Sequence, residues 1–304
     1  MSRAVSYSSH GGPEVLEVID VGEPHPEAGQ VRIAVRAAGL NAFDFKARSS
    51  SAMMPKSTLP RGQGFEFAGV VDEIGADVSD LAVGDEVLGF TDFAAQADYV
   101  VVASNRVAPK PAALDWATAG GIGLVGNTAM RSLDAVALTP GETVLVSAAA
   151  GGVGLIASQL ALRAGATVIA TASPANHDFL RGLGVIPVVY GPGLASRLRD
   201  VAPQGIDAVL DNAGKETVLA ALELGVSPTR INTIVYFEGE AKYGISTIGG
   251  GAKTAEQLSR LADLVASGAL VLPIAATFPL AEVRAAYEQL EGRHVLGKIV
   301  LLVP

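Results

Sequence analysis

The run VLVSAAAGGVG at residues 144–154 constrains the fold of this 304-residue chain more than any other feature. A short apolar strand leads into small residues and then directly into an apolar helix. In such a turn, glycine lets the backbone approach a pyrophosphate, and the helix N-terminus supplies unpaired N–H donors. We therefore place cofactor contacts at four residues of this turn: Ala150, Gly151, Gly152 and Val153. The motif is strictly A-x-G-x-x-G, with Ala149 at the first glycine position, and an ordinary strand–helix turn is the alternative interpretation.

Short apolar runs alternate with helical patterns after Pro111. The runs predict strands at residues 143–146, 167–170, 186–189, 208–210 and 231–235. Helices are predicted between them at 153–164, 178–183, 194–201 and 216–224, and further helices at 255–266 and 281–290. Alternation of this kind predicts a doubly wound parallel sheet, in which Gly154 would allow the first helix to pack closely on its strand.

Residues 4–110 have a different pattern, made of short strands and turns. Val31, Ile33 and Val35 alternate with polar or small residues, which is the period of a half-buried strand. Another β-like run closes the chain at residues 297–302. We expect this part to form a small antiparallel barrel or sandwich.

The composition excludes several classes of function. The chain has no cysteine, so disulfides, thiolate catalysis and cysteine-based metal sites are excluded. It has 31 acidic against 22 basic residues and a formal charge of −9, without a basic block, which argues against nucleic acid or an anionic membrane as partner. No signal peptide or membrane span is visible. We expect a cytoplasmic protein that acts on a small molecule.

The end of the second predicted strand bears on the choice of cofactor. An NAD site usually has Asp or Glu there, to hold the ribose hydroxyls. Here the strand ends in Thr-Ala-Ser at residues 171–173, and the first carboxylate is Asp178. This favours NADPH, whose 2′-phosphate would lie near Ser173, Asn176 and Tyr190. The alternative is that Ser173 only caps the next helix. Asn212, after the fourth strand, lies where a cofactor would cross the sheet.

Several motifs together resemble the medium-chain dehydrogenase/reductase superfamily, in its zinc-free quinone oxidoreductase branch. They are GGPEVL at 11–16, AGLN at 38–41, GQGFEFAG at 62–69, VGDEV at 83–87, the turn at 148–154, and GRHVLGKIVL at 292–301. The resemblance implies an α/β chain in which a Rossmann doubly wound parallel sheet is inserted into a GroES-like β-barrel catalytic domain. The expected domains are 1–112 with 271–304 (catalytic) and 113–270 (NADPH-binding). It also implies a homodimer.

Departures from the zinc-containing relatives are informative. Those relatives carry Cys and His ligands near residues 39–44 and 64–69, where this chain has Asn41, Asp44 and Glu66. The four histidines are scattered without metal-ligand spacing, so we predict no metal site. The quinone branch often has Tyr where this chain has Lys46. We expect Asp44 and Lys46 to form a supporting pair.

Without zinc, hydride transfer to a quinone or an α,β-unsaturated carbonyl compound needs mainly alignment and a donor for the developing oxyanion. The resemblance places Asn41 facing the nicotinamide, where its amide could donate; a loop-stabilising Asn is the alternative. Thr128 starts a helix that approaches the nicotinamide in relatives, and capping is its alternative role. The loop 49–63, with Met53 and Met54, could cover the substrate. Two other functions stay open: a tailoring reductase for one biosynthetic intermediate, and a non-catalytic NADPH-binding sensor or structural protein.

Overall fold

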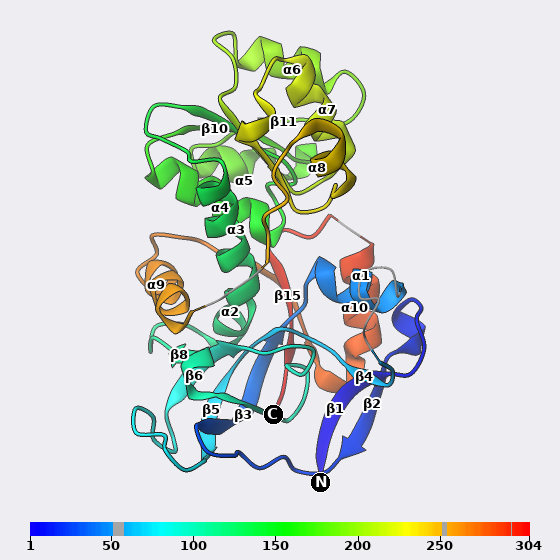
Figure 1. The fold of residues 1–304 in the computed structure, drawn as a ribbon, viewed down its shortest axis with the longest axis vertical. Helices are drawn as coiled ribbons and strands as arrows, with labels where there is room; N and C mark the ends of the chain where they lie inside the picture. The colour runs from blue at the N-terminus through cyan, green and yellow to red at the C-terminus, as the bar shows by residue number, and fades with distance from the viewer. Residues whose placement is uncertain (51–57, 251–253, 293) are drawn as a thin grey trace. The chain divides into compact units, whose positions relative to one another are not determined.

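The computed structural model describes residues 1–50, 58–250, 254–292 and 294–304. Contacts divide the chain into two compact units. One, here called the β-rich unit, consists of Met1–Leu124 and Ala252–Pro304, and the other, the α/β unit, consists of Val125–Gly251. Figure 1 shows the ribbon of both units.

The α/β unit alternates strands with helices. Its strands are β9 (Thr143–Val146), β10 (Thr167–Thr171), β11 (Ile186–Val188), β12 (Ala208–Asp211) and β13 (Ile231–Thr233). Its helices are α4 (Gly152–Arg163), α5 (His177–Gly182), α6 (Leu194–Val201), α7 (Lys215–Glu223) and α8 (Glu238–Tyr243), with short 3-10 turns at Pro174–Asn176 and Pro228–Arg230. Helix α3 (Gly123–Ala135) contains the limit between the two units: Leu124 is the last residue of the first segment of the β-rich unit, and Val125 is the first residue of the α/β unit.

The strands of the α/β unit form a parallel sheet in the order β11-β10-β9-β12-β13. The first strand of this sheet, β9, lies at its centre, and the later strands are added first on one side and then on the other. This arrangement confirms the predicted doubly wound sheet. All five carboxyl ends lie on one edge, and the order reverses between β9 and β12, where ligands bind in such sheets. Leu145, Ile169, Val209 and Ile231 are buried in the core of this unit, because both faces of a parallel sheet are covered.

The β-rich unit contains ten strands among its described residues. They are β1 (Ser2–Tyr7), β2 (Glu17–Val21), β3 (Gln30–Gly39), β4 (Arg61–Gly62), β5 (Glu66–Ile74), β6 (Glu86–Phe90), β7 (Tyr99–Ala103), β8 (Val107–Pro109), β14 (Ile274–Pro279) and β15 (Lys298–Leu302). Its helices are α1 (Ala42–Ser49), α2 (Trp116–Gly121), α9 (Ala255–Ala266) and α10 (Val283–Glu291). Short 3-10 turns lie at Pro13–Val15, Ser104–Arg106 and Leu280–Glu282.

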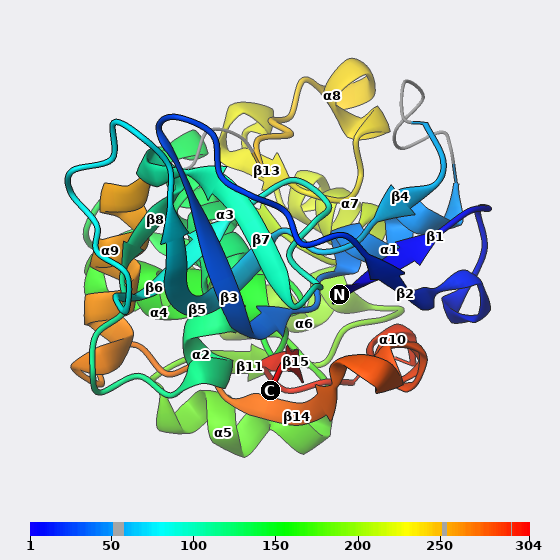
Figure 2. The same ribbon diagram turned by 90° about the horizontal axis from the view of Figure 1, so that it is seen from below.

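Two sheets organise this unit. The smaller has the order β2-β1-β4, and the larger has the order β14-β15-β3-β5-β6-β8, with β7 paired to β3. Pairing in the larger sheet is antiparallel except between β14 and β15. Figure 2 shows β3, β5 and β6 side by side, as the register requires. This placement brings the end of β3, the start of β5 and the start of β15 together.

Most predicted elements have the expected bounds, and the differences have local causes. The strand expected at 231–235 ends at Thr233, because the Thr233 hydroxyl accepts from the N–H groups of Val235 and Tyr236 and turns the chain. The strand around Val31 is more buried than its alternation predicted, since Asp72 pairs with Arg32 at 2.9 Å and the side chain of Arg32 is only 11% exposed. By contacts, α2 and α9 belong to the β-rich unit, and the expected domain limits at 112 and 271 stay a prediction.

Gly154 allows α4 to approach the turn that precedes it. A Cβ on Gly154 would lie 2.5 Å from the carbonyl oxygen of Ala148 and 2.8 Å from the Cα of Ala149. Both obstacles are backbone atoms that cannot move aside without shifting the turn. The predicted role of Gly154 in helix–strand packing is therefore supported by this close approach.

Gly154→Ala should destabilise the α/β unit by about 1–3 kcal/mol, the usual cost of overpacking. Gly182→Ala is the matched control, since a Cβ on Gly182 would meet nothing within 4 Å. That control should be neutral or gain up to about 1 kcal/mol. Urea unfolding of the two variants measures both effects, and equal stabilities would contradict the packing argument.

Candidate functional site

The predicted phosphate-binding turn joins β9 to α4. Ala148 adopts a φ of 49°, and the N–H of Ala149 donates to the carbonyl of Thr171 at 3.0 Å, which ties the turn to β10. Helix α4 begins at Gly152 with Gly151 as its N-cap, and no side chain caps it. The first N–H groups of a helix have no partner inside the helix, so those of residues 152–154 are available to a ligand. This arrangement fits a diphosphate. The N–H of Gly151 already donates to the carbonyl of Ala148 at 3.0 Å, and the cofactor contacts at Ala150 to Val153 stay a prediction.

A buried network holds the neighbouring strand ends in place. Ser147 donates its hydroxyl to Asp211 at 2.8 Å and accepts from the N–H groups of Asn212 (2.8 Å) and Ala213 (3.0 Å). Asp211 also accepts from the hydroxyl of Thr233 at 2.7 Å. The amide of Asn212 donates to the carbonyl of Ser147 at 2.9 Å. Asn212, a predicted cofactor residue, is thus fixed directly beside the phosphate turn. No local motif in the sequence marks Ser147, Asp211 or Thr233 as members of this network.

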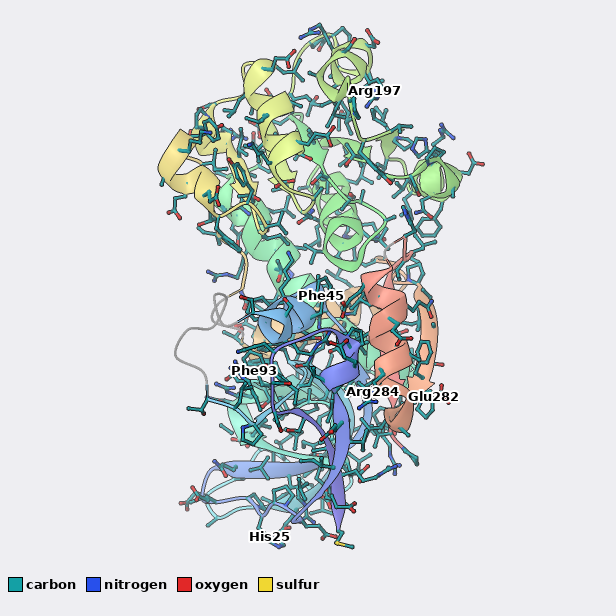
Figure 3. All side chains as sticks on the ribbon, turned by 90° about the vertical axis from the view of Figure 1, so that its right-hand side faces the viewer. His25, Phe45, Phe93, Arg197, Glu282 and Arg284 are labelled. Carbon is teal, nitrogen blue, oxygen red and sulfur yellow. The ribbon has the colours of Figure 1, made fainter. Side chains whose placement is uncertain are left out.

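Two of the residues predicted to contact the 2′-phosphate lie together after β10. Asn176 donates its amide to the hydroxyl of Ser173 at 3.2 Å, and Ser173 is the N-cap of the 3-10 turn at Pro174–Asn176. Tyr190 is 46% exposed and follows β11, the neighbour of β10. Arg197, labelled in Figure 3, donates to the carbonyls of Val189, Gly191 and Pro192 at 2.8–2.9 Å and so fixes the loop that carries Tyr190.

Thr128 lies in α3 and is 6% exposed. It packs near Gly249 and Ile234, since a Cβ on Gly249 would lie 4.0 Å from the Cγ2 of Thr128 and 3.0 Å from that of Ile234. Ile234 directly follows β13. Thr128 therefore lies near the end of a sheet strand, within the same unit as the phosphate turn.

Asn41 belongs to the β-rich unit, where it is the N-cap of α1 and is 6% exposed. Its side-chain amide is held from both ends: Nδ2 donates to Glu66 Oε1 at 2.8 Å, and Oδ1 accepts from Lys298 Nζ at 2.7 Å. Lys298 also donates to Glu66 Oε1 at 2.8 Å and to the carbonyl of Leu40 at 2.6 Å. The amide of Asn41 thus lies against a buried ion pair. Lys298 was identified only as part of the closing motif.

The backbone around Glu66 leaves room for its carboxylate. A Cβ on Gly39 would lie 2.5 Å from Glu66 Oε1 and 2.8 Å from the carbonyl oxygen of Gly120. The second oxygen of Glu66 accepts from the N–H of Leu124 at 2.7 Å, in the first turn of α3. Glu66 therefore uses one oxygen for Asn41 and Lys298 and the other for an N–H group in the first turn of α3.

Asp44 is fully buried beneath Asn41. Its carboxyl accepts from the N–H of Asn41 at 2.7 Å and from the hydroxyl of Tyr287 at 3.0 Å, and Gln96 in turn donates to that hydroxyl at 2.7 Å. Burial raises the pKa of Asp44 to about 7, against the opposing effects of the Asn41 N–H, Lys298 and Tyr287. Burial, with the nearby Asp44, also raises the pKa of Tyr287. The contacts of Asp44 described here come from Asn41 and Tyr287, and its expected pairing with Lys46 stays a prediction.

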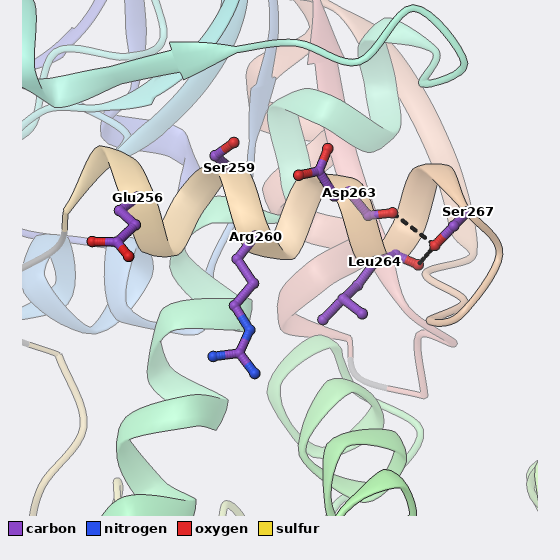
Figure 4. Close-up of a pocket in the computed structure, with 6 residues that line it drawn as sticks. All are labelled: Glu256, Ser259, Arg260, Asp263, Leu264 and Ser267. Atoms are coloured by element: carbon purple, nitrogen blue, oxygen red, sulfur yellow. Dashed lines mark hydrogen bonds between the residues drawn. The ribbon is translucent and has the colours of Figure 1, made fainter.

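Other features contribute less to the site. In the part of the chain that the structure describes, no group of three or more His, Asp or Glu residues could hold a metal ion, and no helix is long and apolar enough to cross a membrane. Met53 and Met54 lie outside the described residues. A shallow pocket follows one face of α9, and Figure 4 shows its lining: Glu256, Ser259, Arg260, Asp263, Leu264 and Ser267. None of the predicted site residues lines it.

Comparisons with known proteins agree with this architecture. Residues 27–112 match the family described as alcohol dehydrogenase GroES-like domain, and residues 183–301 match the one described as zinc-binding dehydrogenase. The quinone oxidoreductase of Pseudomonas aeruginosa is 32% identical over 99% of this chain and 100% of its own length. The chloroplastic NADPH-dependent alkenal/one oxidoreductase of Arabidopsis thaliana is 31% identical over 98% of this chain and 79% of its own length.

A solved structure of a quinone oxidoreductase is also similar to this chain. The quinone oxidoreductase of Escherichia coli in complex with NADPH has a TM-score of 0.88 and 26% identity, covering 99% of this chain and 100% of its own. The chain is therefore a member of the medium-chain dehydrogenase/reductase superfamily. Within it, the chain belongs to the quinone oxidoreductase-like branch, and the predicted combination of a GroES-like and a Rossmann domain is confirmed.

The raised pKa of Asp44 predicts a pH-dependent stability. In the unfolded chain this carboxyl ionises near its ordinary pKa of about 4, whereas in the folded protein it stays protonated up to about pH 7. Its contribution to stability is therefore complete below the unfolded value and is lost as the pH rises through the folded value. Asp44→Asn removes this titration but keeps an oxygen that can accept from Asn41 and Tyr287.

We expect the melting temperature of Asp44→Asn to rise relative to the parent between about pH 4 and about pH 7, and the difference to stay constant at higher pH. The parent and the variant share every other titrating group, including the nearby Lys298 and Glu66, so the difference between their curves isolates Asp44. Differential scanning calorimetry at several pH values measures it. Parallel curves would show that folding does not raise the pKa of Asp44.

Proposed function

We propose that this protein is an NADPH-dependent oxidoreductase that transfers hydride to a quinone or to an α,β-unsaturated carbonyl compound without zinc. The observation that carries the proposal is the set of N–H groups at the start of α4, at the edge where the sheet order reverses. The names of the Pseudomonas and Arabidopsis relatives describe these two substrate classes, and the Escherichia relative was solved with NADPH.

The residues of the α/β unit fit this cofactor. The backbone of residues 150–153 would hold the diphosphate. The Nδ2 of Asn212 donates to Ser147, so its Oδ1 would accept from a hydroxyl or amide group of the cofactor. Ser173, Asn176 and Tyr190 would contact the 2′-phosphate. Residues 172–177 contain no carboxylate that would repel this phosphate. Thr128 would hold the carboxamide or the ribose on the nicotinamide side.

The chain's own residues would align the substrate and stabilise charge. When bound, NADPH supplies the hydride. Negative charge then collects on the substrate oxygen, and we assign its stabilisation to Asn41. An amide has two N–H groups. One of those in Asn41 donates to Glu66, and the other has no acceptor among the described residues, so it is the donor that we assign to the substrate.

The ion pair beside Asn41 supports the zinc-free assignment. Zinc-containing relatives have their ligands near residues 39–44 and 64–69. In this chain the ammonium of Lys298 lies 2.7 Å from Asn41 and 2.8 Å from Glu66, in the same segments. A fixed positive charge at this place repels a divalent cation and occupies the carboxylate that would bind it.

A dedicated tailoring reductase would use the same hydride chemistry on one intermediate, whereas a non-catalytic NADPH sensor would not turn over. The homodimer and the cytoplasmic location stay predictions.

Purified protein should oxidise NADPH when given quinones or enals, and should keep this activity in a chelator such as EDTA. The physical reason is that the charge on the substrate oxygen is stabilised by an amide and not by a metal. Absorbance at the reduced-nicotinamide band follows the reaction. Loss of activity in chelator, restored by zinc, would contradict the zinc-free assignment, and NADPH binding without turnover would favour the sensor.

Ser173→Asp should weaken NADPH binding and improve NADH binding. A carboxylate beside the 2′-phosphate costs roughly 1–4 kcal/mol in Coulomb energy, which corresponds to about tenfold or more in affinity. Ser227→Asp adds the same charge at an exposed site of the same unit and is the matched control. Fluorescence titration of both cofactors measures the change. An unaltered ratio of the two affinities in Ser173→Asp would remove Ser173 from the cofactor site.

A further inference from the structure

We infer that Lys298 and Glu66 are positioning residues that fix the orientation of the Asn41 amide, so that its second N–H is always presented as a donor. This inference rests on the function proposed for Asn41. Neither residue is assigned contact with substrate or cofactor. Their action is on Asn41 alone, through the two hydrogen bonds at the ends of its amide.

The chemistry of Lys298 and Glu66 determines which of them faces Oδ1 of Asn41 and which faces Nδ2. An ammonium group can only donate and an ionised carboxylate can only accept. Lys298 therefore selects the oxygen of Asn41, at 2.7 Å, and Glu66 selects the nitrogen, at 2.8 Å. A flipped amide would place its NH2 group against the ammonium and its oxygen against the carboxylate. Both charge-assisted hydrogen bonds would then be replaced by repulsive contacts.

Burial and hydrogen bonds hold both side chains of the ion pair in place. The side chains of Lys298 and Glu66 are 3% and 1% exposed. All three N–H bonds of the ammonium have acceptors: the Leu40 carbonyl, Asn41 and Glu66. The remaining oxygen of Glu66 is held by the N–H of Leu124. Because all three donors of Lys298 and both oxygens of Glu66 are bonded, the ion pair has one arrangement in this low-dielectric surrounding, and it holds the Asn41 amide rigidly.

The position of the charge also affects the strength of the donor. The ammonium of Lys298 contacts the oxygen of Asn41 and draws electron density from the amide, because hydrogen bonds in series polarise one another. The second N–H of Asn41 is the group that gains from this polarisation. An amide of free orientation would instead present its oxygen to the substrate for part of the time, which would repel the developing negative charge.

The test removes both charges together, because a single unpaired charge would be left buried. Lys298→Met/Glu66→Gln keeps the shape of the pair but no longer specifies the orientation of the amide. The matched control is Lys110→Met/Glu86→Gln, a pair of the same residue types joined at 2.8 Å in the same unit.

The first readout needs no cofactor. In the parent, the two side-chain amide protons of Asn41 should give separate, slowly exchanging NMR resonances, assigned by their loss in Asn41→Ala. In Lys298→Met/Glu66→Gln these resonances should broaden or exchange rapidly with solvent, whereas the control should match the parent. Unchanged, protected resonances in the double variant would overturn the inference, even if the protein had no reductase activity at all.

The second readout is single-turnover hydride transfer from NADPH. The double variant should be slower by about tenfold or more, as misplaced catalytic groups usually are, with NADPH affinity unchanged. Asn41→Ala should then cost much less in the double variant than in the parent, because residues that act through one another are not additive. The inference would be overturned if Asn41→Ala slowed hydride transfer by the same factor in the double variant as in the parent. It would also be overturned if the double variant were as fast as the parent. A parent that transfers no hydride would instead refute the proposed function, and the NMR result would still decide the positioning.

Discussion

The buried contact between Lys298 and Glu66 is the interaction on which the described site of the β-rich unit depends. It joins the start of β15 to the start of β5, and through Leu40 and Asn41 it also holds the end of β3. Removing two charges from water costs several kcal/mol per ion, and their attraction repays this only with good geometry and further hydrogen bonds. Here those bonds are present, and each of them fixes a backbone or side-chain group beside Asn41.

In the α/β unit, the donors of the predicted phosphate turn are neutral backbone groups and not a buried ion pair. Its phosphate turn offers backbone N–H groups, and the supporting carboxylate, Asp211, is buried and occupied by Ser147 and Thr233. The hydrogen bonds that its oxygens accept fix Asp211 and, through Ser147, the residues that follow β12. In the proposed function, the two units contribute separately: the α/β unit would bind the phosphates, and the β-rich unit would supply the oriented amide of Asn41.

The sequence predicted the features that have a local period or a local motif. The strands and helices of the α/β unit and the close packing at Gly154 follow from patterns within about 15 residues. The partners of Asn41 do not, since Glu66 lies 25 residues and Lys298 lies 257 residues away in the chain. Only the assembled sheet brings β3, β5 and β15 together. For Asp44, the sequence predicted a pair with the nearby Lys46, whereas Tyr287, which donates to its carboxyl, is 243 residues distant.

The central claim is that the amide of Asn41 donates to the substrate oxygen on which charge develops. A crystal structure of the protein with NADP⁺ and a reduced product or a stable substrate analogue tests it most directly. We expect Asn41 Nδ2 to lie about 2.7–3.2 Å from the carbonyl oxygen of the ligand, with Oδ1 still bonded to Lys298. A ligand oxygen bonded to other groups, with the amide of Asn41 out of hydrogen-bond reach, would contradict the claim.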